Sequence, residues 1–435
     1  MRRVIIIVVL GLLALLTAGM AFLYEPDTDR EEMIALYGGE QARWAPVEGH
    51  QDYRVHYRVS GPEDAPVLVL IHGTAASLHT WAPLRERLDQ DYRVIAYDQP
   101  GHGLTGPHPE RDYTFAGMRE GLDAVLKATN TTEAVLIGNS MGGWVAWRMA
   151  LDEPELVKGL VLIDPAGVPV EEESEGNIGF TIAQSSLGRA LMKKITPRSL
   201  IESSVKQTVA DENMVTPEMV DRYHDLLRFP GNREAAGDQF ISPRQDLSGR
   251  LGEINAPTLI LWGEEDRLIP VAAGRVFERD IPGAELIVYE GVGHLPMEEA
   301  PDRTAEDISG FLARLEKSAP SLAERLAGEW LLVSLDGEEP LRGDNGRIAG
   351  ATFTEERVGG SAGCNGGGAA ILSWTENGYA TDGVFVATKM LCANLMPQEE
   401  LLFAILNHGA VRFEGETLVM TGPNGTEARF ERADE

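Results

Sequence analysis

A five-residue segment, Gly-Asn-Ser-Met-Gly at positions 138–142, constrains the fold of this chain more than any other feature. It follows residues 133–137, a short apolar run typical of a buried strand, and precedes residues 143–151, an apolar, proline-free stretch typical of a helix packed on a sheet. A serine on so sharp a turn has a strained backbone, and its hydroxyl points away from the sheet. Glycine is needed on both sides because a Cβ atom would collide with the strand and the helix. The segment therefore predicts a nucleophile elbow at Ser140.

Other apolar runs along the chain have the same character, and each leads into a loop of small and polar residues. These runs are residues 67–71, 94–97, 159–163, 258–262 and 285–289. Strands that alternate with helices form a mostly parallel sheet, whose functional loops lie at the carboxyl ends of the strands. Ser140, Asp266 and His294 all follow such runs. We therefore expect an α/β fold with a doubly wound sheet that brings these three residues to one edge.

The order serine, carboxylate, histidine along the chain is that of a catalytic triad. His294 would accept the proton of the Ser140 hydroxyl as a general base and return it to the leaving group. Asp266 would hold the tautomer of the imidazole ring and stabilise its protonated form. Asp164 also follows a strand and is an alternative acid.

Three longer motifs surround these residues: positions 70–81 (LIHGTAASLHTW), 98–107 (DQPGHGLTGP) and 138–147 (GNSMGGWVAW). With them, this part of the chain resembles the serine-nucleophile branch of the α/β-hydrolase superfamily. Dehalogenases and epoxide hydrolases of that superfamily differ in carrying aspartate at the elbow. The resemblance implies that the backbone N–H groups of Thr74 and Met141 form an oxyanion hole and that the serine forms an acyl-enzyme.

The resemblance also implies a helical cap over the active site, at approximately residues 168–252. Three amphipathic stretches in this region are expected to be helical, at residues 182–195, 198–209 and 217–227. Cap helices line the substrate pocket, exclude water and control entry. Candidate pocket residues are Phe180, Met192, Met214, Met219, Tyr223 and Phe229. The alternative for each is ordinary packing between cap helices.

The amino terminus predicts a membrane anchor. Arg2 and Arg3 precede an uncharged apolar run over residues 4–24, which is long enough to cross a hydrocarbon core of ~30 Å. Because positive residues stay in the cytoplasm, we expect residues 1–24 to span the cytoplasmic (inner) membrane, with both domains in the periplasm or outside. The alternative is a cleaved signal peptide, which would leave a secreted or periplasmic protein. Residues 25–44 are predicted to form a membrane-proximal helix.

The hydrolase-like domain is expected at residues 45–317. Residues 53–59 alternate between polar and apolar side chains, which predicts the first, antiparallel strand of the sheet. Residues 318–321 are predicted to be a linker. Beyond it, short strand-like runs separated by Gly, Asn and Asp indicate a small antiparallel domain at residues 322–435. These runs are residues 330–335, 351–354, 383–387, 411–413, 418–420 and 428–430.

Both cysteines of the chain, Cys364 and Cys392, lie in this second domain. In an exported domain two cysteines most simply pair, and the bond would stabilise the fold by restricting the unfolded chain. The domain resembles the META domain at residues 326–330 (LAGEW), 363–365 (GCN) and 388–392 (TKMLC). That family has no settled enzymatic role, so the resemblance implies an envelope-associated β-rich module more than an activity.

Composition and spacing exclude several other functions. The formal net charge of −30 keeps the chain soluble and repels nucleic acid and anionic lipid surfaces. No group of His, Cys and carboxylates has the spacing of a metal site, and no loop resembles a P-loop, so we expect neither a metal nor a cofactor. His72 and His102 lie beside glycine-rich turns, where we expect them to satisfy backbone groups.

The sequence thus favours a membrane-anchored, extracytoplasmic serine hydrolase that acts on small-molecule carboxylic esters. Amides and activated C–C bonds are further candidates for the same chemistry. The alternative is a non-catalytic envelope protein that retains the hydrolase fold as a binding scaffold. An intact set of Ser140, Asp266 and His294 favours the enzyme.

Overall fold

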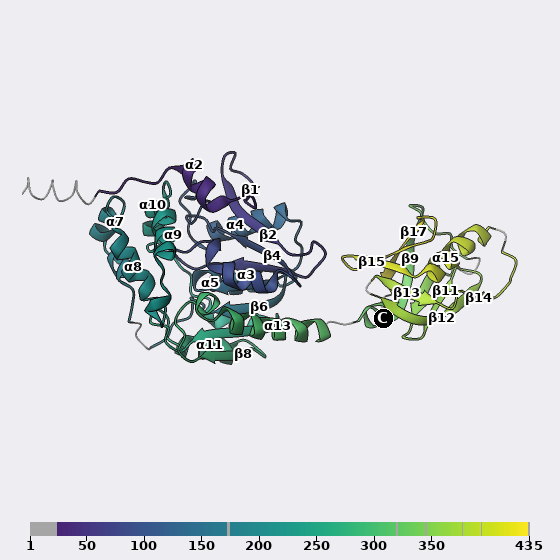
Figure 1. The fold of residues 1–435 in the computed structure, drawn as a ribbon. Helices are drawn as coiled ribbons and strands as arrows, with labels where there is room; N and C mark the ends of the chain where they lie inside the picture. Colours follow the sequence, from purple (N-terminus) through teal and green to yellow (C-terminus); the bar gives the residue numbers. More distant parts are fainter. Residues whose placement is uncertain are drawn as a thin grey trace, which may run out of the picture. The chain divides into compact units, whose positions relative to one another are not determined.

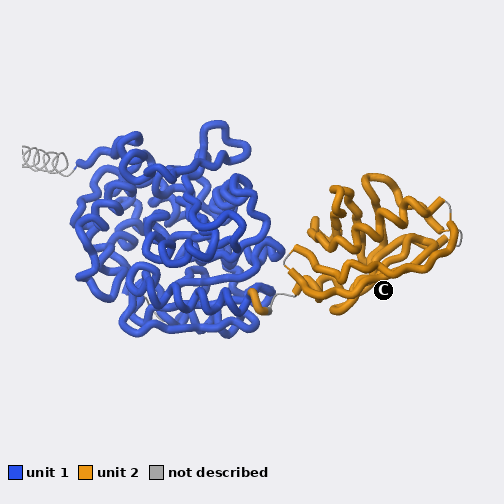
Figure 2. The backbone as a smooth tube through the Cα atoms, turned by 45° about the vertical axis from the view of Figure 1, so that its right-hand side comes forward, with its two compact units in different colours: residues 1–315 blue, residues 316–435 orange. Residues whose placement is uncertain are grey.

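The chain forms two compact units, residues 1–315 and residues 316–435 (Figure 2). The computed structural model describes six stretches of chain: residues 24–171, 175–318, 321–343, 346–375, 377–392 and 394–433. The anchor predicted at residues 1–24 therefore lies outside the described residues except for Tyr24. Within the described stretches, no helix is both long enough and apolar enough to cross a membrane.

Unit 1 is built on a sheet of eight strands in the order β1-β2-β4-β3-β5-β6-β7-β8 (Figure 1). The strands are β1 Arg43–Pro46, β2 Arg54–Ser60, β3 Val67–Ile71, β4 Arg93–Tyr97, β5 Ala134–Asn139, β6 Val157–Ile163, β7 Thr258–Gly263 and β8 Glu285–Tyr289. β2 is antiparallel to both of its neighbours, and the strands from β3 to β8 run parallel. The loops that follow the parallel strands therefore gather at one edge of the sheet.

Helices cover both faces of this sheet and enclose an apolar core on each side (Figure 1). One face carries α4 Phe115–Ala128, α5 Met141–Asp152 and α11 Ala272–Asp280, and the other carries α3 Ala82–Leu88, the short α12 Pro296–Glu299 and α13 Pro301–Ser318. Within β3, Val69 and Ile71 enter the first core, whereas Leu68 and Leu70 enter the second. Burial on both faces explains why the strand runs are continuously apolar. The predicted α/β fold is confirmed.

The segment before the sheet differs from the prediction. The helix expected over residues 25–44 is confined to α2 Arg30–Met33 and a π-helical turn, η1 Ile34–Gly38. Gly39, which follows, has a left-handed φ of 66° and ends the helix. The chain then forms β1, which pairs with β2. The run at residues 53–59 is therefore the second strand of the sheet, and its prediction as the first strand was wrong.

Between β6 and β7 the chain forms a helical cap. Its helices are α6 Ile178–Gln184, α7 Ser186–Met192, α8 Arg198–Lys206, η3 Glu212–Met214, α9 Pro217–Leu227, α10 Asn232–Gln239 and η4 Ser248–Glu253. The single helix predicted over residues 182–195 is divided at Ser185, whose backbone is extended. The Ser185 hydroxyl accepts the Gly188 N–H and so starts α7.

Unit 2 is a closed antiparallel sheet with the order β11-β10-β9-β17-β16-β15-β13-β12-β14, in which β11 also pairs with β12. The elements are α14 Leu322–Leu326, β9 Gly328–Leu335, β10 Gly350–Phe353, β11 Arg357–Ser361, β12 Gly366–Thr375, β13 Gly378–Thr381, β14 Val386–Ala387, α15 Met396–His408, β15 Ala410–Glu414, β16 Thr417–Thr421 and β17 Glu427–Arg432. Helix α15 packs into the core of this sheet through Leu402, Ile405 and Leu406.

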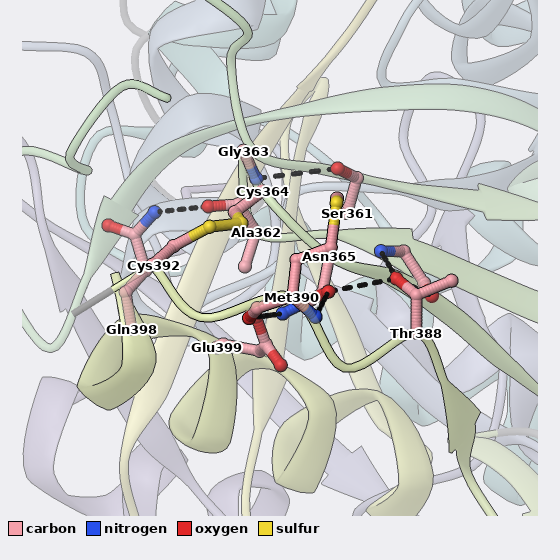
Figure 3. The surroundings of a disulfide bond; sticks show 11 residues. Ser361, Ala362, Gly363, Cys364, Asn365, Thr388, Met390, Cys392, Gln398 and Glu399 are labelled. Carbon is pink, nitrogen blue, oxygen red and sulfur yellow. Dashed lines mark hydrogen bonds between the residues drawn. A yellow bond between two sulfur atoms is a disulfide. The ribbon is translucent and has the colours of Figure 1, made fainter. Parts of the chain in front are cut away.

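The two cysteines are joined in a disulfide, as predicted (Figure 3). The bond links the loop after β11 to the segment before α15. Buried Asn365 fastens the same two segments, because its amide donates to the Met390 carbonyl (3.0 Å) and the Glu399 carboxylate (2.8 Å). Its Oδ1 accepts the Thr388 hydroxyl (2.9 Å) and the Met390 N–H (2.8 Å). Asn365 is thus fully engaged within the domain, which indicates a structural role.

Candidate active site

Ser140 lies on the sharp turn between β5 and α5. Its backbone has φ 54° and ψ −117°, a conformation that residues with a side chain rarely adopt. The turn is tight, since a Cβ atom on Gly138 would lie 2.3 Å from the Gly142 carbonyl oxygen. A Cβ atom on Gly142 would lie 1.9 Å from the Ile71 carbonyl oxygen. Glycine at both positions therefore lets β3, β5 and α5 meet around the serine.

His294 and Asp266 are hydrogen-bonded at the same edge of the sheet. Nδ1 of His294 lies 2.7 Å from Oδ2 of Asp266, so Nδ1 carries the proton and donates it to the carboxylate. The other oxygen of Asp266 accepts the N–H groups of Leu268 (2.7 Å) and Ile269 (3.1 Å). In the neutral ring Nε2 is then free of a proton, which is the tautomer that a general base requires.

Ser140 and His294 line the same pocket. The Ser140 hydroxyl makes no hydrogen bond to the His294 ring within the described chain. The structure therefore brings the acid and the histidine into contact, and places the serine in the cavity that the histidine lines. Catalytic hydrogen bonds of this kind are often long or poorly aligned until substrate binds.

Asp164, the alternative acid, lies beside this pair. Side-chain ligand atoms of Asp164, Asp266 and His294 all lie within 4.8 Å of one another. Asp164 is fully buried, and its Oδ1 accepts the Gly263 N–H at 2.9 Å. Burial, and then the negative charge of Asp266, raise the pKa of Asp164 well above its usual range. The structure thus favours Asp164 as a protonated, neutral group and Asp266 as the carboxylate bonded to the histidine.

The predicted oxyanion donors lie on two segments that meet at the elbow. Met141 is the first residue of α5, so its N–H has no partner within the helix. The loop after β3 touches the nucleophile, because a Cβ atom on Gly73 would lie 3.0 Å from the Cβ atom of Ser140. Thr74, the next residue, lines the pocket with Ser140. Both N–H groups therefore belong to segments that border the serine.

Comparison with known families decides the identity of unit 1. The family model of the alpha/beta hydrolase fold matches residues 66–301, more than half of the chain. The chain belongs to the α/β-hydrolase family. A second model matches residues 323–435, so unit 2 of this hydrolase is a META domain.

Individual relatives of the hydrolase have different activities. YugF, an uncharacterized hydrolase of Bacillus subtilis, is 29% identical over 276 residues, which are 61% of this chain and 96% of the relative. A 2-hydroxy-6-oxononadienedioate/2-hydroxy-6-oxononatrienedioate hydrolase of Burkholderia vietnamiensis is 31% identical over 280 residues, 62% of this chain and 94% of the relative. The solved structure of a membrane phospholipase A, a bacterial virulence factor, has a TM-score of 0.57 at 26% identity and covers 73% of this chain and 100% of its own.

The hydrolase pocket lies between the edge of the sheet and the cap. Its apolar wall includes Phe180 from α6, Ile201 and Val205 from α8, and Leu227 from α9. Ile201 and Val205 are four residues apart, so they share one face of their helix. None of the described residues that line the pocket is Lys or Arg. The pocket therefore suits an uncharged, apolar group.

Two of the six predicted pocket residues, Phe180 and Tyr223, line this cavity. The other four do not, and their prediction as lining residues is corrected here: Met192, Met214, Met219 and Phe229. Phe229, for example, is fully buried beside Met33 of the amino-terminal segment. Size and apolarity alone do not show which way a cap side chain points. The apolar pair at i and i+4 in α8 was the signal that would have found Ile201 and Val205.

Asn139, the residue before the nucleophile, holds the histidine loop of the hydrolase against the elbow, a role that the sequence did not predict. It is buried, and its side-chain amide donates to the carbonyl oxygens of Ile163 and His294, both at 3.1 Å. A polar residue at the end of a fully buried strand was the available signal, since such a group needs hydrogen-bond partners. Asn139 is therefore a positioning residue for the histidine.

Glu299 ties the histidine loop to the cap. Its carboxylate accepts the N–H groups of Gly293 (3.0 Å) and Ala210 (2.8 Å). The His294 N–H in turn donates to the Thr208 carbonyl oxygen at 2.8 Å. The cap segment approaches so closely that a Cβ atom on Gly293 would lie 2.8 Å from the Ala210 nitrogen. A displacement of this part of the cap would therefore displace the histidine.

His72 and His102, predicted to be structural, are bound to backbone groups. Nδ1 of His72 donates to the Gly73 carbonyl oxygen (2.8 Å), and its Nε2 accepts the Gln99 N–H (3.0 Å). Nδ1 of His102 lies 3.1 Å from the Pro100 carbonyl oxygen. The surrounding loops thus hold the side chains of His72 and His102 in place.

A second group of potential metal ligands, His50, His108 and Glu120, gathers away from the pocket, with ligand atoms within 4.8 Å of one another. Nδ1 of His108 accepts the N–H groups of Glu110 (3.2 Å) and Asp112 (3.3 Å). In the neutral ring Nε2 therefore carries the proton and donates it to Glu120 at 3.1 Å. A metal at Nε2 would have to displace that proton, so the group is better explained by hydrogen bonding.

Proposed function

We propose that this protein is a serine hydrolase that cleaves uncharged carboxylic esters. The observation that carries the proposal is the pocket, in which Ser140 and His294 face apolar walls without a lining Lys or Arg among the described residues. The Burkholderia relative is named for a dienedioate, which is a dicarboxylate. Burial of an unpaired carboxylate costs several kcal/mol, so this pocket is poorly suited to such a substrate. The likeness to a membrane phospholipase A also supports an ester as the target.

The geometry supports a two-step reaction. Oγ of Ser140 attacks the ester carbonyl carbon while Nε2 of His294 takes the hydroxyl proton, and Asp266 stabilises the imidazolium. The backbone N–H groups of Thr74 and Met141 donate to the oxyanion of the tetrahedral intermediate. The intermediate then releases the alcohol, which leaves with the proton held by His294, and the acyl group stays on Ser140. Water, deprotonated by His294, attacks the acyl-enzyme and releases the carboxylic acid.

A fluorophosphonate probe, which reacts with activated serines, tests this function. We expect an adduct on the wild-type protein and none on Ser140→Ala. Ser203→Ala is the matched control, because Ser203 is exposed on α8 and its hydroxyl bonds only to the Ser199 carbonyl oxygen among the described residues. A series of p-nitrophenyl esters of increasing chain length then defines the acyl group. Absence of an adduct on the wild-type protein would instead support the non-catalytic scaffold.

We also propose that residues 1–24 anchor the protein in the cytoplasmic membrane, with both units outside. The support is Arg2-Arg3 before an apolar run, together with the disulfide of unit 2, a bond that persists in oxidising compartments. Protease added to intact spheroplasts should digest the META domain without permeabilisation. Protection of that domain until the membrane is lysed would refute this topology.

A further inference from the structure

The cap exposes apolar side chains along one side of α7. Leu187 is 69% exposed and Leu191 is 40% exposed, and Ala190 between them is also exposed. With Lys194 these residues are spaced i, i+3, i+4 and i+7, so they lie on one side of the helical turn. Ile178, 42% exposed, begins α6, which packs against α7. A gathered apolar surface of this kind marks an interaction site more often than single exposed apolar residues do.

The charge of this part of the cap is opposite to that of the whole chain. Residues 176–201 contain no Asp or Glu, although the formal net charge of the protein is −30. Arg189, Lys193 and Lys194 supply positive charge on or directly after α7. The repulsion of anionic surfaces expected from the net charge is therefore reversed locally. Apolar side chains with adjacent Lys and Arg are the combination that binds anionic lipid surfaces.

The described chain begins against this same helix (Figure 1). The Glu25 N–H donates to the Lys194 carbonyl oxygen at 3.0 Å. The acidic side chains here are paired, Glu25 with His224 at 3.0 Å and Asp27 with Arg233. The apolar run predicted to enter the membrane ends one residue before Glu25, a distance of ~3.8 Å between Cα atoms. A chain anchored through that run would hold the end of α7 at the membrane surface.

We propose that the α7 face, formed by Leu187, Ala190, Leu191 and Lys194, docks on the surface of the lipid bilayer. Leu187 and Leu191 enter the interface between headgroups and acyl chains, and Lys193 and Lys194 contact anionic headgroups. The neighbouring helix α6 supplies Phe180 to the pocket wall. The docked face thus lies on the helix that packs against α6, which contributes to the pocket wall. If the hydrolase function proposed above holds, the substrate is an acyl ester that resides in the membrane.

Depth-dependent fluorescence quenching tests the docking. Among the described residues both cysteines are in the disulfide, so an added cysteine is the sole free thiol there. Ala190→Cys places an environment-sensitive dye (NBD) on the face, and Asp64→Cys places it at the opposite edge of the sheet, before β3. With the full chain in phosphatidylglycerol-containing nanodiscs, each holding one copy, we expect a blue shift and quenching by nitroxide-labelled lipid at position 190. Position 64 should show neither.

Reversal of the charges of Lys193 and Lys194 gives a second test of the docking. Each basic residue near an anionic surface contributes about 1 kcal/mol, or about five-fold in the binding constant. Lys193→Glu with Lys194→Glu should therefore reduce quenching at position 190, whereas Lys127→Glu, an exposed lysine paired with Glu48, should not. A dye at position 190 that stays as exposed to water as one at position 64 would overturn the proposal. A blue shift that appears only with two copies per disc, without lipid quenching, would assign the face to self-association and also overturn it.

The proposal that the substrate resides in the membrane is tested separately from the catalytic function. Ser140→Ala should leave the quenching at position 190 unchanged, so a failure of the proposed hydrolase function does not affect the docking result. Leu187→Asp with Leu191→Asp should lower hydrolysis of a lipid ester embedded in vesicles and leave hydrolysis of water-soluble p-nitrophenyl butyrate unchanged. An equal loss of both activities would show that these leucines support the fold of the cap, and would contradict the proposed route from the bilayer.

Discussion

Two carboxyl groups lie at the histidine of the active site, and their surroundings give them different roles. Asp266 is hydrogen-bonded to the His294 ring, whereas Asp164 is fully buried beside this pair and has a raised pKa. Asp266→Asn removes the group that fixes the ring tautomer, so we expect kcat to fall by about 10⁴-fold. Asp164→Asn mimics a protonated carboxyl, and we expect kcat to stay within about ten-fold of the wild type. The measurement is kcat on a p-nitrophenyl ester. A larger loss of kcat in Asp164→Asn than in Asp266→Asn would make Asp164 the acid of the triad.

Asp164 also predicts a pH dependence of stability. Because its pKa is raised in the folded protein, folding takes up a proton, and wild-type stability falls as pH rises from the unfolded pKa of about 3.9 through the folded value. Asparagine does not titrate. The free energy of unfolding of Asp164→Asn, relative to the wild type, should therefore increase with pH across this window. Urea unfolding of unit 1 at a series of pH values measures this difference, and a difference that does not change with pH would contradict the prediction.

The role of a residue was predictable from sequence only where its neighbours in the chain determine that role. Ser140 was identified because its glycines, its strand and its helix are all neighbours in the chain. Asp164 and Asp266 both follow buried strands, so the pattern did not decide between them. What separates them is the position of the His294 loop, which reaches Asp266 from a distant part of the chain. Contacts of this kind depend on tertiary structure.

At the level of elements, the histidine loop and the cap share hydrogen bonds, and this coupling is testable at Gly293. A Cβ atom there would press on the Thr208 carbonyl oxygen and the Ala210 nitrogen, both 2.8 Å away. Gly293→Ala should therefore move His294, and a misplacement of about 1 Å costs about 10²-fold in rate. We expect kcat/KM on a soluble ester to fall accordingly. Gly310→Ala is the control, because a Cβ atom on Gly310 in α13 would lie 3.9 Å from the Arg314 side chain. The activity of this variant should match the wild type.

The elements were predicted well where burial is uniform and poorly where glycine is frequent. β3 was found at its observed residues and β7 to within one residue, because a parallel strand buried on both faces is a continuous apolar run. β11, β12 and β13 were missed. In β11 and at the start of β12, glycines at residues 359–360 and 366–368 leave few apolar side chains to show an alternation. Three of these glycines are packed closely: a Cβ atom would lie 2.3 Å from Leu406 on Gly360, 2.7 Å from Phe385 on Gly367 and 2.8 Å from the Val358 carbonyl oxygen on Gly368. Close packing of this kind has no signature in hydropathy.

At the scale of the whole molecule, the two units have separate apolar cores. The cores of unit 1 lie on the two faces of its sheet, and the core of unit 2 lies within its closed sheet, where α15 packs. Both units were predictable from the sequence, because apolar runs that alternate with helices indicate the first and short strands separated by turns indicate the second. Because each unit has its own core, a substitution in one unit can change the stability of that unit alone. We therefore expect two cooperative transitions on unfolding.

Removal of the disulfide in unit 2 tests whether the two units unfold separately. Cys364 and Cys392 are 28 residues apart, and a closed loop of that length stabilises a fold by roughly 3–4 kcal/mol through its effect on the unfolded chain. Cys364→Ser with Cys392→Ser should lower the melting temperature of one calorimetric transition and leave the other, together with activity on a soluble ester, unchanged. A reducing agent should reproduce the shift in the wild type and have no effect on the double variant. If both transitions move together, the META domain contributes to the stability of the hydrolase, and the two cores are energetically coupled.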